Sequence, residues 1–278
     1  MPSPVLNERT LKEAPNTWAP PDPSTATYQA PIDDGPISTW RPKVMTVNGT
    51  ISATAVLFVL LLASAVAGWI NTGSPEIVTN SDGQLVYNYS IPALAWAGVI
   101  VGFGLALLLM FRPHLAKFVA PIYAIAEGFF VGALSRMYET FFNGIVVQAA
   151  GATIAVFAVM LVLYRTRILK VTERMRMVVT TATIGIMVFY GVCFLIQLFA
   201  GSGSVSFLAS PSLLGIAFSV FVAGLAAFNL ALDFDFIERG SKMGLDKNFE
   251  WYGAFGLLVT IVWLYLEMLR LLSKLRSR

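Results

Sequence analysis

Seven long apolar runs, separated by short polar segments, dominate the pattern of this chain. Each run holds roughly 20 or more residues, which as an α-helix is enough to cross a hydrocarbon core of about 30 Å. The strands of a membrane barrel would instead appear as short segments of alternating polarity. The pattern therefore predicts an all-α membrane protein, a seven-transmembrane-helix bundle, with helices over residues 50–70, 92–111, 115–138, 143–164, 177–200, 211–235 and 251–272.

The first 43 residues form a separate region. They hold nine of the fourteen prolines, together with many Ser, Thr, Asp and Asn residues. Such a segment cannot bury enough apolar surface to offset the entropy lost on ordering it. We therefore expect a disordered, proline-rich cytoplasmic tail over residues 1–43 and a seven-helix transmembrane domain over residues 44–278.

Lys and Arg are distributed unequally among the connections between the predicted helices. The connections after the second, fourth and sixth helices carry ten of them, and those after the first, third and fifth carry only Arg136. Because cytoplasmic loops are enriched in Lys and Arg, the N-terminus is predicted to be cytoplasmic. The C-terminal segment is also basic, although seven crossings would place it outside. Either the last helix fails to cross or the other loops outweigh this segment, and we favour seven crossings because residues 251–272 are long enough to span.

Composition narrows the classes of function. Hydrophobic residues make up 56% of the chain and charged residues 13%, about half the usual charged share of soluble proteins. The net charge of +3 does not indicate nucleic-acid binding, because the basic residues flank the apolar runs. Cys193 is the single cysteine and His114 the single histidine, and the sequence has no HExxH, GxSxG or P-loop motif. We expect a multi-pass membrane protein whose partner is the lipid bilayer. We expect this protein to have no resident cofactor and not to be an enzyme.

Acidic residues inside a bilayer are costly and are therefore candidates for function. Glu127 has the sharpest signal, since it lies roughly 18 Å into the third predicted helix at about 1.5 Å per residue. It has no basic residue three or four positions away on its own helix. Its carboxyl group must face a cavity, pair with another helix, or stay protonated. The alternative to a functional role is an inert hydrogen bond between helices.

Asp233 and Asp235 lie at the inner end of the sixth predicted helix. Two residues apart, they point about 200° away from each other, so at most one faces the bundle core. Both are candidates for a cation or proton site at the cytoplasmic mouth, and Arg112 could pair with Asp233 or could snorkel as a topology residue. Asp235 could instead be an interfacial charge balanced by Arg239 and Lys242.

Glu267 lies near the far end of the seventh predicted helix, three residues before Arg270. The simplest interpretation is an ion pair on the helix surface, since residues at this spacing are neighbours on a helix. The functional alternative places Glu267 on the same ion path as the other acids.

Three segments resemble the transmembrane Bax inhibitor motif family. GAFGLLVTIVWLYLEMLRLL (253–272) is similar to its last helix, LDFDFI (232–237) to the segment that ends its sixth helix, and FRPHLAKF (111–118) to its basic junction before helix three. In order and spacing the resemblance covers about residues 50–272. It implies a seven-helix fold in which the last helix is central, and members are described as pH-sensitive calcium leak channels.

The resemblance also implies roles for particular residues. Asp233 matches the helix-six aspartate of the family's proton sensor, and Arg112 matches an arginine that latches the closed state. The position of the second aspartate is Thr260, which cannot titrate. Two neighbouring carboxylates share a proton and so sense pH, whereas one aspartate facing a threonine does not. A second acid would have to come from Glu127 or Glu267.

The resulting hypothesis is a bacterial plasma-membrane protein that permits a slow leak of cations, with calcium as the transported ion. Asp233 and Glu127 would line the path and contact the metal ion, and Arg112 would close its cytoplasmic end. Some bacterial members of the family instead modulate a membrane protease. The alternative is therefore a non-conducting regulator that binds a membrane protease or another membrane-protein partner.

Overall fold

The computed structural model describes residues 44–73, 76–79, 85–88, 93–200 and 210–278. The predicted tail, residues 1–43, lies outside the described residues. In the described part, the seven long helices are α2 (Val47–Asn71), α3 (Ala93–Phe111), α4 (Ala116–Phe141), α5 (Ile145–Arg165), α6 (Glu173–Ala200), α7 (Leu213–Lys242) and α8 (Phe249–Arg276). The 3-10 turn η2 (Pro113–Leu115) joins α3 to α4. The prediction of seven helices long and apolar enough to span a membrane is thereby confirmed.

Two features differ from the sequence prediction. The strands β1 (Glu76–Thr79) and β2 (Leu85–Asn88) form an antiparallel hairpin between α2 and α3, with Ile77 opposite Tyr87. Helix α7 runs to Lys242, well beyond residue 235, because its charged last turns are stabilised by ion pairs at i,i+4 spacing. Apolar runs therefore mark where a helix crosses the membrane but underestimate how far it continues.

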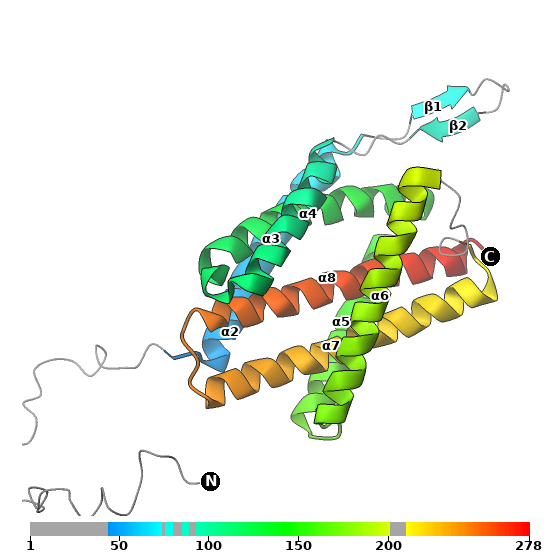
Figure 1. Cartoon of the computed structure of the whole chain (residues 1–278). Coiled ribbons are helices and arrows are strands. Elements are labelled where there is room, and N and C mark those ends of the chain that lie inside the picture. The colour runs from blue at the N-terminus through cyan, green and yellow to red at the C-terminus, as the bar shows by residue number, and fades with distance from the viewer. Residues whose placement is uncertain (1–43, 74–75, 80–84, 89–92, 201–209) are drawn as a thin grey trace, which may run out of the picture. The chain divides into compact units, whose positions relative to one another are not determined.

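Helix α8 is the central element of the bundle. It contacts α2, α4, α5 and α7, and Figure 1 shows it lying between α7 and the group formed by α3 and α4. Gly253, Leu258, Leu264 and Leu269 are buried at successive levels along it. This confirms the central last helix that the resemblance implied.

Helices α2 and α4 pack backbone against backbone through glycines. A Cβ atom at Gly132 would lie 2.7 Å from Ala65 Cα, and one at Gly128 would lie 3.0 Å from Leu61 Cα. Ser64 Oγ donates a hydrogen bond to the Ile125 carbonyl oxygen at 2.6 Å across the same contact. Small residues are common at helix contacts in membranes because they allow this close approach.

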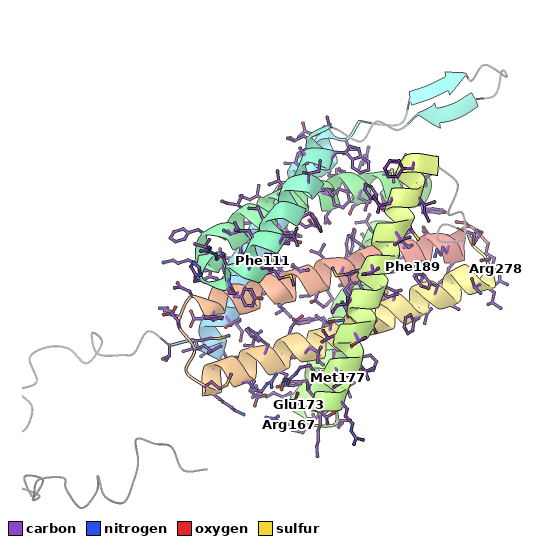
Figure 2. The ribbon with its side chains drawn as sticks, viewed as in Figure 1. Phe111, Arg167, Glu173, Met177, Phe189 and Arg278 are labelled. Atoms are coloured by element: carbon purple, nitrogen blue, oxygen red, sulfur yellow. The ribbon has the colours of Figure 1, made fainter. Side chains whose placement is uncertain are left out.

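The outer faces of the helices carry many exposed large apolar side chains. Phe111 and Met177 are labelled examples that point away from the helices in Figure 2, and each is at least 70% exposed. Apolar surface of this extent is rare on soluble monomers but suits contact with lipid chains. The structure therefore supports a multi-pass membrane protein whose outer surface faces a bilayer.

The two ends of the bundle differ in composition. We call the end that carries residues 44–46, η2 and the α5–α6 and α7–α8 connections the basic end. At the opposite end, Arg276 Nη1 donates to the Asn143 carbonyl oxygen of the α4–α5 connection at 2.7 Å. Helix α8 therefore runs from the basic end to the opposite end, as seven crossings require. Arg276 thus makes a structural contact at the end that the charge bias of the other loops would leave poor in basic residues.

Candidate functional site

Asp233 lies on the face of α7 that packs against α8. Its Oδ1 atom would be 3.5 Å from a Cβ atom at Gly256, so the absence of a side chain there leaves room for the carboxylate. The Thr260 hydroxyl, one turn further along α8, lies beside the same carboxylate. That hydroxyl also donates to the Gly256 carbonyl oxygen at 3.1 Å, so its single proton has two competing acceptors. In the described part of the chain, Asp233 Oδ2 is buried and has no hydrogen-bond partner.

The two positions that the resemblance pairs, Asp233 and Thr260, therefore face each other across the α7–α8 contact. The chemistry at this contact is a carboxylate beside a hydroxyl. Asp235 points away from this contact and toward α6, as the predicted 200° separation requires.

Glu267 lies seven residues beyond Thr260, which is about two turns and therefore the same face of α8. The predicted ion pair with Arg270 is present at 2.5 Å between Glu267 Oε1 and Arg270 Nη1. The prediction that this pair lies on the helix surface is wrong, because Glu267 is only 1% exposed. Tyr190 of α6 covers it and donates to Oε1 at 3.0 Å, while Glu267 Oε2 is buried without a partner in the described residues.

Lys274 continues the same face by a further seven residues, and sequence reasoning missed it. It is 2% exposed, and its Nζ donates to the Gly215 carbonyl oxygen at 2.9 Å and to Ser219 Oγ at 2.8 Å. Its charge suggested a topology residue, whereas the regular spacing after Thr260 and Glu267 was the available signal. We call Ser219, Asp233, Thr260, Glu267 and Lys274 the polar stripe of the α7–α8 interface.

Glu127 lies in a different group of side chains. A Cβ atom at Gly102 of α3 would be 3.2 Å from its Oε2, and the Tyr123 hydroxyl lies within hydrogen-bonding reach of its carboxylate. The Tyr123 ring packs edge-on against Phe255 of α8, with 4.9 Å between ring centroids. Among the described contacts, Glu127 is therefore linked to α8 through the rings of Tyr123 and Phe255. The Glu127 side chain lies on the α3–α4 side of α8.

Arg112 lies between the last residue of α3 and η2, where its side chain is exposed. Among the described residues, its charge forms no ion pair with Asp233. The latch contact that the resemblance implies is therefore absent among the described residues, and the latch role of Arg112 stays a prediction.

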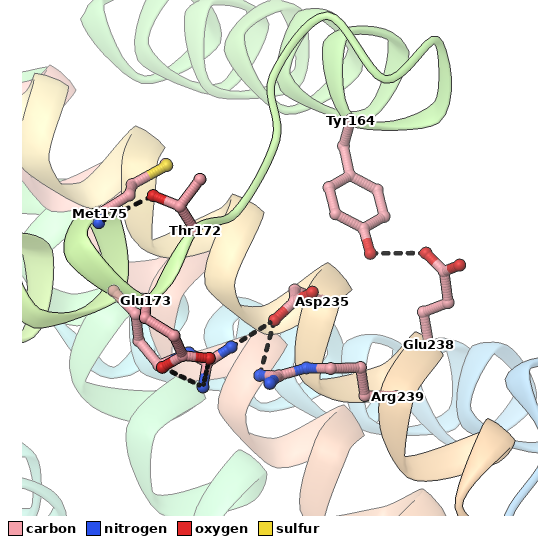
Figure 3. Close-up of polar contacts among 8 residues, drawn as sticks. Tyr164, Thr172, Glu173, Met175, Asp235, Glu238 and Arg239 are labelled. Carbon is pink, nitrogen blue, oxygen red and sulfur yellow. Dashed lines mark hydrogen bonds and ion pairs between the residues drawn. The ribbon is translucent and has the colours of Figure 1, made fainter.

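An ionic cluster joins α6 and α7 at the basic end, as Figure 3 shows. Asp235 Oδ2 lies 2.6 Å from Arg239 Nη2 and 3.1 Å from Arg176 Nη2 of α6. Arg176 also contacts Glu173 at 3.2 Å. Asp235 Oδ2 is therefore paired with two arginine side chains, which agrees with the alternative of an interfacial charge. Its partners are Arg239 and Arg176, whereas Lys242 pairs elsewhere.

Glu238, which sequence reasoning did not single out, holds the α5–α6 connection against α7. It accepts from Tyr164 Oη at 2.6 Å and from Arg167 Nη2 at 2.6 Å, and it also pairs with Lys242 at 2.5 Å. The hydrogen bond and charge of Glu238 raise the pKa of the Arg167 guanidinium. The Glu238–Lys242 spacing was visible in the sequence, but the contacts to Tyr164 and Arg167 depend on the tertiary structure.

No group of three or more His, Cys, Asp or Glu side chains that could hold a metal ion occurs in the described ranges. A cation at Asp233 would therefore be held by one carboxylate, hydroxyl and carbonyl oxygens, and water. Such a site is weaker and less selective than a cage of several carboxylates. It suits transient contact with a passing ion better than storage of a bound one.

Comparison with protein families gave one match. Residues 3–277 match the family described as Bax inhibitor 1 like. The match extends through most of residues 1–43, beyond the span of about 50–272 over which the sequence motifs were recognised. Comparison with curated proteins and with solved structures gave no match.

Proposed function

This chain belongs to the Bax inhibitor 1-like family of proteins, and on that premise we propose that it permits a slow leak of cations, calcium among them, across a bacterial plasma membrane. In this proposal the protein acts as a passive path and not as an enzyme, and it needs no resident cofactor. The basic end faces the cytoplasm, because the loops at that end carry the excess of Lys and Arg.

The observation that carries the proposal is the unpartnered oxygen of Asp233. A buried carboxylate oxygen without a hydrogen-bond partner is costly in an apolar environment. A cation, a proton or a water molecule at that position would remove the cost. Because the site lies between two helices near the basic end of the apolar span of α7, we propose that the species that fills it enters along the α7–α8 contact.

The polar stripe supplies the remainder of the path. Glu267, nearer the opposite end, has a second unpartnered carboxylate oxygen. The Thr260 hydroxyl lies between the two acids on the same face of α8. We propose that Asp233 and Glu267 are successive cation contacts and that Glu127 acts from the α3–α4 side. The exposed Arg112 is the proposed latch of a more closed conformation.

Thr260 bears on the proposed pH response. In place of a second aspartate opposite Asp233, this chain has the Thr260 hydroxyl, and Glu267 lies about two turns further along α8. A lone carboxylate titrates as one site, whereas two coupled sites titrate in separated steps. We therefore propose that Asp233 acts as one site, without the proton that two neighbouring acids would share, and that the leak lacks the steep pH response of a coupled pair.

Calcium flux into indicator-loaded liposomes tests the proposal. We expect Asp233→Asn and Glu127→Gln to reduce the flux of the reconstituted protein severalfold. Glu173→Gln serves as the control, because the Glu173 side chain is 82% exposed at the basic end. Flux that is the same in Asp233→Asn as in the unmodified protein would remove Asp233 from the path.

The second candidate function is a non-conducting regulator of a membrane protease or another membrane-protein partner. Thr260 favours it, since a member without the second acid lacks the paired sensor. Deletion of residues 2–43 separates the two functions. Loss of partner co-purification from a folded, truncated protein supports the regulator, whereas calcium flux that persists after truncation supports the leak path.

A further inference from the structure

We propose that Met45 is the inner gate of the α7–α8 path, and that residues 44–46, the gate segment, hold it in place. The consequence for flux rests on the proposed function. The gate controls access to Asp233 from the basic end, and this access can be tested without a measurement of calcium flux.

Met45 fills a socket made by glycines on both helices of the path. It is 1% exposed, although it lies outside the helices and precedes α2. Its Sδ would lie 2.9 Å from a Cβ atom at Gly240 of α7, and its Cε would lie 3.4 Å from one at Gly253 of α8. A larger residue at either glycine would leave too little room for the thioether. The unbranched, flexible methionine side chain suits an irregular gap of this kind.

The socket is in line with Asp233. On α8, Gly256 faces Asp233, and Gly253, almost one turn nearer the basic end, faces Met45 and Ile237. On α7, Ile237 and Gly240 follow Asp233 in the same direction. Gly240 is seven residues from Asp233, which is about 10 Å along the helix. Met45 therefore closes the α7–α8 contact between Asp233 and the basic end, and an apolar constriction of this kind excludes water and hydrated ions.

Backbone contacts hold the gate segment to the α7–α8 connection. Met45 N donates to the Leu245 carbonyl oxygen at 2.6 Å, and Val44 forms an antiparallel bridge with Asp246. Thr46 donates from its backbone N at 3.0 Å and from its Oγ1 at 2.9 Å, in both cases to Glu250 Oε1. Glu250 is buried in the first turn of α8, where the helix dipole favours a carboxylate.

These contacts allow Met45 to leave without damage to the path. Met45 is not itself part of α7 or α8. Its withdrawal therefore unwinds neither of the helices that carry the polar stripe. The gate segment is held by hydrogen bonds at the end of the bundle, and its withdrawal would exchange them for hydrogen bonds to water. A packing residue within α7 or α8 could not move in this way.

Thiol modification measures access directly. With Cys193→Ser as background, Asp233→Cys is treated with the water-soluble cation methanethiosulfonate ethyltrimethylammonium from the basic end. We expect slow modification with Met45 present and modification at least about tenfold faster with Met45→Ala, because the alanine side chain no longer fills the space between Gly240 and Gly253. Met45→Leu, which keeps the volume, and Met243→Ala, at an exposed methionine of the same end, should both match the unmodified gate. An equal rate in Met45→Ala and Met243→Ala overturns the gate.

A reversible disulfide across the gate segment provides the second test. This test keeps Met45 and so creates no cavity in the protein. Val44→Cys and Asp246→Cys are opposite each other in an antiparallel bridge, a spacing that suits a disulfide. In the Cys193→Ser background, we expect calcium flux to fall on oxidation and to return on reduction. Flux that is present but equal in both states overturns the gate. Faster thiol modification in Met45→Ala without calcium flux in any variant supports the gate and refutes the leak.

Discussion

The buried ion pair between Glu267 and Arg270 permits a quantitative prediction. The Glu267 side chain is 2% exposed and that of Arg270 is 34% exposed, with 2.5 Å between the paired atoms. Glu267→Gln removes the negative charge but keeps an amide oxygen that can accept from Tyr190. The Arg270 guanidinium then remains inside the bundle without a compensating charge.

The expected cost follows from the difference in exposure. Removing one partner of a fully buried pair costs about 3–5 kcal/mol. Because a third of Arg270 is exposed and partly screened by solvent, we expect a loss of about 2–3 kcal/mol in the free energy of unfolding. Glu173 and Arg176 form a pair with the same residue types and the same i,i+3 spacing, but Glu173 is 82% exposed. For Glu173→Gln we expect about 0.5 kcal/mol or less.

Reversible unfolding in mixed micelles, titrated with dodecyl sulfate, measures both losses. A double-mutant cycle with Arg270→Gln then isolates the coupling between the two charges. We expect this coupling to exceed that of Glu173 with Arg176 by at least about threefold. If Glu267→Gln costs no more than Glu173→Gln, burial of the pair does not decide its strength and the reasoning is wrong.

Three further outcomes are expected. Gly132→Leu should cost about 2 kcal/mol or more in detergent unfolding, because the new side chain meets the α2 backbone. Gly104→Leu, with nothing within 4 Å of its Cβ position, should leave the free energy of unfolding unchanged. Equal losses would contradict this account of the α2–α4 contact. Lys274→Met should cost about 1–3 kcal/mol in the same assay, because the buried Gly215 carbonyl and Ser219 hydroxyl lose their hydrogen bonds from Nζ, and an unchanged midpoint would show that these bonds do not stabilise the fold. Thr260→Asp should make liposome flux more steeply dependent on pH, because it places a second carboxylate beside Asp233; an identical pH profile would argue against that proximity.

Local interactions could be predicted from the sequence because they depend on spacing along one helix. The seven spans follow from run length, and the opposite directions of Asp233 and Asp235 follow from helical geometry. The Glu267–Arg270 pair was predictable for the same reason. None of these inferences needs to know which helix lies beside which.

Neighbours across the bundle could not be predicted in this way. Lys274 meets Ser219 at a separation of 55 residues, and Thr46 meets Glu250 at a separation of 204. Because these partners lie on different elements, no spacing rule links them, and the polar stripe and the gate segment were accordingly not predicted. The same holds for the contacts of Glu238 with Tyr164 and Arg167.

The sequence by itself determined that the chain has seven segments long and apolar enough to cross a membrane and that some of its acids lie within them. Only the tertiary structure decided which of those acids are buried together, and it moved Glu267 from an expected surface position to the interior. The physical reason is that lipid chains are as apolar as a protein core. An apolar helix face therefore looks the same in sequence whether it meets lipid or another helix, and only the packed bundle distinguishes the two.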